Sequence, residues 1–119
     1  MTKAVRFHKT GGPEVLVYED VEVGAPGEGQ ARVRNNAIGL NFIDTYHRTG
    51  LYKLPALPAV LGVEGAGVVT QVGEGVSDLK EGDRVAYAGP MGSYATERLA
   101  PADRMVKLPA TISDETAAA

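Results

Sequence analysis

Short runs rich in β-branched residues alternate with breaks that contain glycine and proline along the whole chain, a pattern typical of all-β domains. Residues 31–38 show it most clearly, because apolar and polar side chains alternate through the first half of this run, as in a half-buried strand. On the same grounds we predict strands at residues 3–7, 16–22, 31–38, 67–72, 83–88, 93–99 and 105–107. Turns are predicted at 11–13, 25–29 and 81–83. The pattern therefore predicts a mainly β domain, a barrel or a sandwich.

A short helix is predicted directly after Asn41. Asn41 is a favourable N-cap residue, and Asp44 occupies the third helical position, from which its carboxylate can reach back to the cap. Phe42 and Tyr46 share one face at i,i+4, and Asp44 can pair with Arg48 at the same spacing.

A second helix is predicted to begin at the C-terminal end of the chain. Ser113 is a suitable N-cap, Asp114 and Glu115 fall in the first turn, and an alanine run follows. The chain stops after less than two turns, and isolated helices of this length are unstable because nucleation is costly. We therefore expect the sequence to be the N-terminal part of a longer protein; a flexible tail is the alternative.

Composition narrows the class of protein. The chain has 119 residues, of which 44% are hydrophobic and 23% charged, with a formal net charge of −3, so we expect one small globular domain. The mild acidity argues against a nucleic-acid surface, which needs a basic patch. There is no apolar run of the roughly 20 residues that a membrane span needs and no apolar leader, so we expect a cytoplasmic protein that does not bind membranes.

Cysteine is absent from the sequence. Disulfides, thiolate nucleophiles and cysteine-based zinc or iron–sulfur sites are therefore excluded. His8 and His47 are the only imidazole ligands and lie far apart in sequence, so no metal site is expected.

Two glycine pairs invite comparison with a dinucleotide-binding loop. After Gly65 and Gly67 the third glycine position holds Thr70, and after Gly73 and Gly75 it holds Asp78. Neither pair lies between a buried parallel strand and a long helix, as the fingerprint requires. We interpret the first pair as a place where strands approach closely and the second as a turn.

Motifs along the full length together resemble the N-terminal half of medium-chain dehydrogenases/reductases, and more narrowly the zinc-free, zeta-crystallin-like quinone oxidoreductases. They stand in the order GGPEVL at 11–16, GLNFIDTY at 39–46, PAVLGVEGAGVV at 58–69, VGEGV at 72–76, GDRVAY at 82–87, GSYATE at 92–97 and LP at 108–109. The resemblance implies a GroES-like, partly open β-barrel with short helices over residues 1–112. It implies that residues 113–119 begin a truncated helix that leads to an absent Rossmann domain.

The resemblance also implies that both zinc sites of the zinc-dependent relatives are absent from this chain. In the zinc-dependent relatives a cysteine ligand lies near the position of Asn41, a histidine ligand lies where this chain has Val63, and a structural-zinc lobe would follow Tyr87. Without zinc as a Lewis acid, oxidation of a simple alcohol is implausible. A quinone or another conjugated ketone is already electrophilic, so hydride transfer to it needs mainly placement and a donor to the developing oxyanion.

The resemblance then implies roles for residues of the first helix. Phe42, Ile43, Asp44, Thr45 and Tyr46 would approach the nicotinamide half of NADPH. Asn41, Tyr46 and Tyr52 would line the acceptor pocket as catalytic residues, since a tyrosine ring packs on a flat quinone and its hydroxyl donates to an oxygen. The full-length enzyme would be a homodimer, and the fragment alone would be inactive.

Several residues also have a purely structural interpretation. Asn41 and Asp44 could be only helix caps, and Tyr46 and Tyr52 could be packing residues. Phe42 and Ile43 are expected in the core, Glu64 is expected to be a buried structural carboxylate, and His47 and Arg48 are expected to face outward. We also expect residues 96–98 to form a solvated strand face.

Two alternative functions remain from the sequence. One keeps the superfamily but reduces an enone or enoyl thioester. The other is a non-enzymatic GroES-like binding module, which would need a long mobile loop with an apolar tip; the nearest candidate, residues 51–61, is short and rich in proline.

Overall fold

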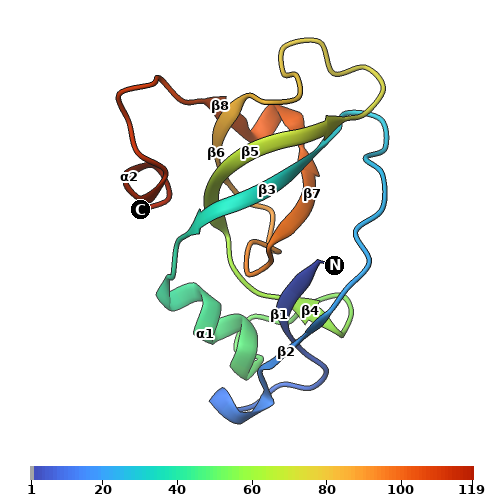
Figure 1. The fold of residues 1–119 in the computed structure, drawn as a ribbon. Helices are drawn as coiled ribbons and strands as arrows, with labels where there is room; N and C mark the ends of the chain where they lie inside the picture. The colour runs from blue at the N-terminus through green and yellow to red at the C-terminus, as the bar shows by residue number, and fades with distance from the viewer. Residues whose placement is uncertain (1) are drawn as a thin grey trace.

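The computed structural model describes residues 2–119, which form two antiparallel β-sheets (Figure 1). The three-stranded sheet has the order β2-β1-β4 and the five-stranded sheet the order β7-β3-β5-β6-β8. The strands are β1 (Lys3–Phe7), β2 (Val17–Asp20), β3 (Gln30–Ile38), β4 (Ala59–Val60), β5 (Glu64–Val72), β6 (Arg84–Ala88), β7 (Glu97–Pro101) and β8 (Met105–Lys107). The helices are α1 (Phe42–Thr49) and α2 (Asp114–Ala117), with 3-10 turns at Pro13–Val15 and Ala102–Arg104. The predicted mainly β fold is confirmed.

The predicted strand at 93–99 is only partly correct, because β7 begins at Glu97. Before it, the chain crosses between the two sheets: the Tyr94 N–H donates to the Leu61 carbonyl at 2.8 Å, and the Tyr94 carbonyl accepts from the Val5 N–H at 2.8 Å. The β4 strand was not predicted. It has only two residues, which pair with β1, so it carries too little alternation to be recognised in a sequence.

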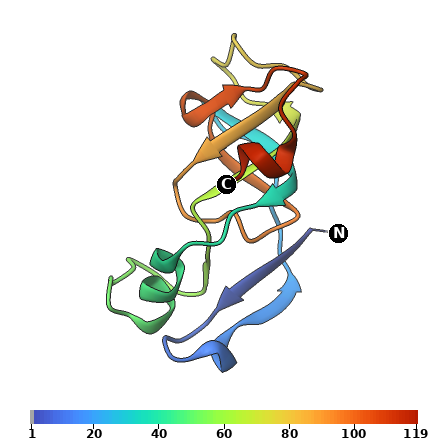
Figure 2. The same cartoon turned by 90° about the vertical axis from the view of Figure 1, so that its left-hand side faces the viewer.

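The hydrophobic core lies in two clusters. The larger one is enclosed by the five-stranded sheet and has Val33, Val69 and Val85 fully buried at its centre. The smaller one lies under β1 and centres on Phe7, with Leu61 packed against it. Figure 2 shows the corresponding division: β1, β2 and α1 lie on one side of the molecule and the five-stranded sheet on the other. Leu61 and Tyr94 lie on chain segments that run between these two parts of the molecule.

The central strands β3 and β5 pair with an irregular register. Asn35 pairs with Gly67 and Ala37 with Ala66, so Asn36 is an extra residue on β3. A bulge of this kind bends the strand and redirects its side chains. Here the Asn36 amide donates to the Asp114 carboxylate at 3.1 Å, so the bulge contributes to holding α2.

The helix predicted at the C-terminal end is present, with its predicted cap. The Ser113 Oγ accepts from the Thr116 N–H at 3.1 Å. Arg84 donates to the Asp114 carboxylate at 3.0 Å, and Ala118 is buried against the domain. Tertiary contacts therefore stabilise a helix of four residues that would not form by itself. In the part of the chain that the structure describes, neither helix has the length and apolar character needed to cross a bilayer.

One ion pair between β3 and β7 makes stability depend on pH. The Arg32 Nη2 lies 2.5 Å from the Glu97 Oε2, and the Thr2 hydroxyl donates to the same oxygen. The hydrogen bond from Arg32 lowers the pKa of Glu97 below its ordinary value of 4.5. Since the pKa is lower in the folded state, this carboxylate stabilises the fold above about pH 4.5, and the contribution is lost as the pH falls through the folded pKa.

We therefore expect Glu97→Gln to lower the free energy of unfolding at pH 7 and to have a much smaller effect at pH 3. Urea unfolding at both pH values measures the difference. Glu81→Gln, at an exposed turn position, is the control and should change neither value. An equal loss at pH 3 and pH 7 would contradict an ionic contribution.

Candidate functional site

The N-terminus of α1 is held by a buried carboxylate. The Asn41 backbone N–H donates to the Asp44 Oδ2 at 3.0 Å, as the predicted cap requires, and Asp44 is only 3% exposed. The Tyr94 hydroxyl donates to the same oxygen at 2.6 Å. The helix ends at Gly50, whose φ of 87° is readily adopted only by glycine. Asp44 thus connects the start of α1 to the segment that crosses between the sheets.

The Asn41 side chain is held separately. Its Nδ2 donates to the Glu64 carboxylate, at the start of β5. Glu64 is half-buried, so the prediction of a buried structural carboxylate was only partly correct. The asparagine is consequently more than a helix cap, because its backbone and its side chain have different partners.

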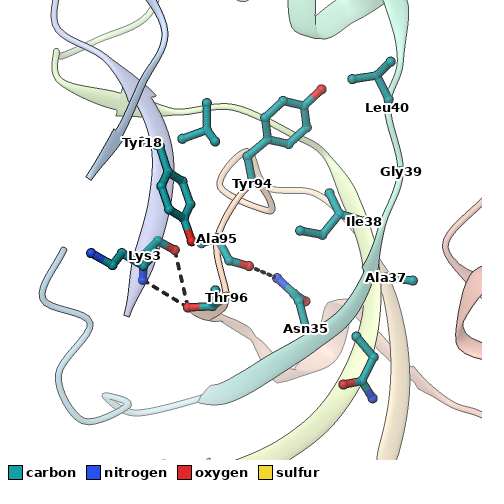
Figure 3. Close-up of a pocket in the computed structure, with 12 residues that line it drawn as sticks. Lys3, Tyr18, Asn35, Ala37, Ile38, Gly39, Leu40, Tyr94, Ala95 and Thr96 are labelled. Atoms are coloured by element: carbon teal, nitrogen blue, oxygen red, sulfur yellow. Dashed lines mark hydrogen bonds between the residues drawn. The ribbon is translucent and has the colours of Figure 1, made fainter. Parts of the chain in front are cut away.

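Three hollows meet around residues 38–41. A groove of about 380 Å³ lies between β1, β2 and β3. Figure 3 shows Tyr18, Ile38, Leu40 and Tyr94 around it. On the α1 side, a cavity of about 480 Å³ is lined by Leu16, Leu40, Asn41, Phe42, Asp44, Thr45, Arg48, Leu61 and Tyr94. A third hollow, of about 420 Å³, lies toward α2 and is bordered by Asn41, Glu64, Glu115 and Ala118 among others. Asn41 borders the second and third hollows.

The exposed face of α1 carries aromatic side chains. Phe42 is 84% exposed and Tyr46 is 38% exposed, so the i,i+4 prediction of a shared face agrees with the structure. Tyr52 lies beside Tyr46, with their ring centroids 5.5 Å apart and their planes at 71°. The expectation that Phe42 and Ile43 belong to the core was wrong: Phe42 is exposed and Ile43 is half-buried, because the buried side of α1 is occupied by Asp44. The Thr45 hydroxyl donates to the Phe42 carbonyl at 2.6 Å.

Two further predictions for α1 were wrong. Arg48 does not pair with Asp44; its Nε donates to the Gly11 carbonyl at 3.1 Å, and its own carbonyl accepts from the Gly11 N–H at 3.0 Å. His47 and Arg48 are half-buried rather than outward-facing, because the loop at Gly11 packs against the end of the helix. The His47 Nδ1 is buried and has no hydrogen-bond partner among residues 2–119.

Tyr94 and Arg98 were not recognised in the sequence as part of this region. Burial and the hydrogen bond to Asp44 raise the pKa of Tyr94, so its hydroxyl stays protonated and can donate. Arg98 was expected on a solvated face, yet it is 6% exposed: it donates to the Pro90 carbonyl at 2.8 Å and lies over the Tyr87 ring at 5.0 Å. Burial lowers the pKa of Arg98. Arg98 thereby anchors the loop that leads to Tyr94.

The region around α1 offers hydrogen-bond donors and exposed aromatic rings, and it has no glycine-rich phosphate loop; Tyr46 and Tyr52 line none of the three hollows described above. Gly65 and Gly67 lie inside β5, and Gly73 and Gly75 lie at the following turn, which confirms their structural interpretation. An exposed aromatic ring on α1 can pack on a planar group, and the Asn41 amide, which borders one hollow together with Phe42, has a second N–H that can donate. Asp44 is buried, and its carboxylate accepts hydrogen bonds from the Asn41 backbone and the Tyr94 hydroxyl. In residues 2–119 no three His, Asp or Glu side chains gather closely enough to hold a metal ion.

Comparison with known proteins supports the family resemblance found in the sequence, along nearly the whole chain. Residues 27–110 match the family model described as the alcohol dehydrogenase GroES-like domain. Quinone oxidoreductase from Pseudomonas aeruginosa is 53% identical over 120 residues, which cover 100% of this chain and 37% of that protein. A 2-haloacrylate reductase from Burkholderia is 49% identical over 113 residues, covering 92% of this chain and 34% of that protein.

Solved structures agree with the sequence comparison. The crystal structure of Escherichia coli quinone oxidoreductase complexed with NADPH is 50% identical and superposes with a TM-score of 0.95, over 99% of this chain and 36% of that chain. The chain therefore spans a little over a third of the length of these relatives. The matched residues and the fold together show that the chain belongs to the alcohol dehydrogenase GroES-like domain family and corresponds to the N-terminal portion of the quinone oxidoreductases in the medium-chain dehydrogenase/reductase superfamily.

Proposed function

We propose that this chain is the N-terminal catalytic-domain portion of an NADPH-dependent reductase that transfers hydride to a quinone without zinc. The observation that carries the proposal is a pair of exposed tyrosines, Tyr46 on α1 and Tyr52 just after it, whose rings meet edge to face. A flat, electron-poor acceptor can stack on such rings, and phenol and amide groups can donate to its oxygen. The similarity to quinone oxidoreductases supports the same acceptor.

We assign different roles to the residues of α1 and its flanks. Phe42, Ile43, Thr45 and Tyr46 would hold the nicotinamide half of NADPH, which supplies the hydride when bound. Asp44 contributes by fixing the backbone of Asn41 through the contact at 3.0 Å. Asn41, Tyr46 and Tyr52 would orient the acceptor and stabilise charge on its oxygen. Residues 113–119 would lead into a Rossmann domain that carries most of the cofactor surface, so residues 1–119 alone should be inactive. The full-length enzyme would be a cytoplasmic homodimer.

A second acceptor class is favoured by one observation. The Burkholderia relative is named a 2-haloacrylate reductase, and an acrylate, like a quinone, has a carbon–carbon double bond conjugated to a carbonyl. A site that positions an electron-poor double bond and donates to the attached oxygen can serve both substrates. Conjugated carboxylates and enones are therefore the alternative substrates to test.

A domain transplant tests the proposal. Residues 1–119 would replace the corresponding 120 residues of the Pseudomonas aeruginosa quinone oxidoreductase, and NADPH oxidation would be followed with 1,4-benzoquinone and with 2-chloroacrylate. We expect the chimera to reduce the quinone and the isolated chain to give no turnover. A second chimera, carrying the equivalent Escherichia coli segment, controls for the new domain boundary. A folded chimera that binds NADPH but reduces neither acceptor, beside an active control, would refute the proposal.

A further inference from the structure

Glu64 has a contact that the proposed function does not use. It is the first residue of β5, and its backbone carbonyl accepts from the Gly39 N–H at 3.1 Å. This bond fixes where the glutamate side chain leaves the strand, next to the segment that carries Asn41. The carboxylate then accepts from the Asn41 Nδ2. The contact joins residues 23 positions apart in sequence, so the fold and not the local chain creates it.

Gly39 keeps the path of this side chain open. A Cβ at position 39 would overlap the Glu64 side chain and would lie 2.5 Å from the Ala118 carbonyl oxygen. Real Cβ atoms do not approach other atoms this closely, so no larger residue fits without moving Glu64 or the C-terminal segment. Glycine at position 39 therefore leaves the room that the Glu64 side chain occupies.

The chemistry of the pair determines how the Asn41 amide is oriented. An ionised carboxylate can only accept hydrogen bonds, so it is the amide nitrogen, not the amide oxygen, that must face Glu64. One amide N–H is thereby occupied, and the other N–H and the Oδ1 are left for other partners. Charge-assisted bonds of this kind are stronger than neutral ones, so the amide is held in a single orientation. The Asp44 carboxylate holds the backbone of the same residue from the other side.

We propose that Glu64 is a positioning residue: its carboxylate fixes the Asn41 amide so that the free N–H is directed to the oxygen of the bound acceptor. The inference rests on the proposed function for its consequence in catalysis, but the orientation of the amide can be measured without any substrate. Glu64 touches no reacting atom in this scheme. Its effect passes through Asn41, and it should appear in the rate of reaction more than in cofactor binding.

Nuclear magnetic resonance on the 119-residue chain tests the orientation directly. In the wild type we expect an Overhauser contact between the Asn41 side-chain amide protons and the Glu64 Hγ protons, and one Asn41 amide proton shifted downfield by its bond to a carboxylate. Glu64→Gln keeps the side-chain volume but removes the charge and lets the amide adopt either orientation, so this shift should collapse. Glu74→Gln, at an exposed turn, is the matched control and should leave it unchanged. Absence of the wild-type contact would overturn the proposal even if the variant failed to fold.

Kinetics of the chimera supply the second readout. We expect Glu64→Gln to lower kcat for quinone by roughly tenfold to a hundredfold, as misplacement of a single group does, with the KM for NADPH unchanged. Equal kcat in the folded variant would overturn the positioning role. If the chimera with the unaltered segment had no quinone activity at all, the proposed function would fail, whereas the resonance data would still decide the Glu64–Asn41 contact.

Discussion

Gly67→Ala should lower the free energy of unfolding by about 3 kcal/mol, at the upper end of what overpacking costs. Gly67 lies in β5 opposite the bulged part of β3, and a Cβ there would be 2.8 Å from the Arg34 carbonyl carbon and 2.9 Å from the Asn35 Cα. Both neighbours are backbone atoms of the paired strand, so no rotation of a side chain can relieve the overlap. The two central strands would have to separate, which would disrupt their pairing and the core packed beneath them.

Thermal unfolding followed by circular dichroism measures this effect, and we expect the melting temperature to fall by roughly 10 °C for a domain of this size. Gly27→Ala is the control. It has the same change in composition, but its nearest neighbour is the Gln30 Oε1 at 3.4 Å, the end of a flexible side chain. A melting temperature within 2 °C of the wild type for Gly67→Ala would show that the strands do not approach as the structure describes.

Replacing Tyr46 and Tyr52 together with phenylalanine should reduce kcat/KM for quinone about a hundredfold in the chimera, the size of effect seen when a donor to a developing oxyanion is removed. The rings pack edge to face at 5.5 Å, and phenylalanine keeps that contact. Both rings are partly exposed, at 38% and 50%, so loss of their hydroxyl groups leaves no buried polar atom without a partner. The change therefore tests chemistry with little effect on folding.

Steady-state kinetics with varied quinone and fixed NADPH measures the loss, and the melting temperature shows whether the fold is retained. Tyr18→Phe is the matched control, because Tyr18 is 66% exposed on β2 and borders the groove of about 380 Å³, which neither Tyr46 nor Tyr52 lines. Unchanged kcat/KM in the folded double variant would leave Tyr46 and Tyr52 with only a structural role in the helix and its packing.

Local features of the fold could be predicted where neighbouring residues in the chain determine them. The cap of α1 at Asn41 and Asp44, the cap of α2 at Ser113, and strands β1 and β8 all follow from residues a few positions apart. The start of β7 could not be predicted in this way. Residues 93–96 have the composition of a strand, but their hydrogen bonds go to Leu61, Val5 and Lys3 in other parts of the fold.

The candidate site shows the same division. The sequence by itself determined the family and the helix that follows Asn41, because the motifs around GLNFIDTY stand in a specific order and the cap residues are neighbours in the chain. Only the tertiary structure decided how the residues of that helix are held. Tyr94 and Glu64 reach Asp44 and Asn41 from 50 and 23 positions away, so the buried cap and the oriented amide exist only once the sheets are assembled. Burial also reversed the expected positions of Phe42 and Arg48, since a helix of eight residues turns its face toward whichever neighbours the fold supplies.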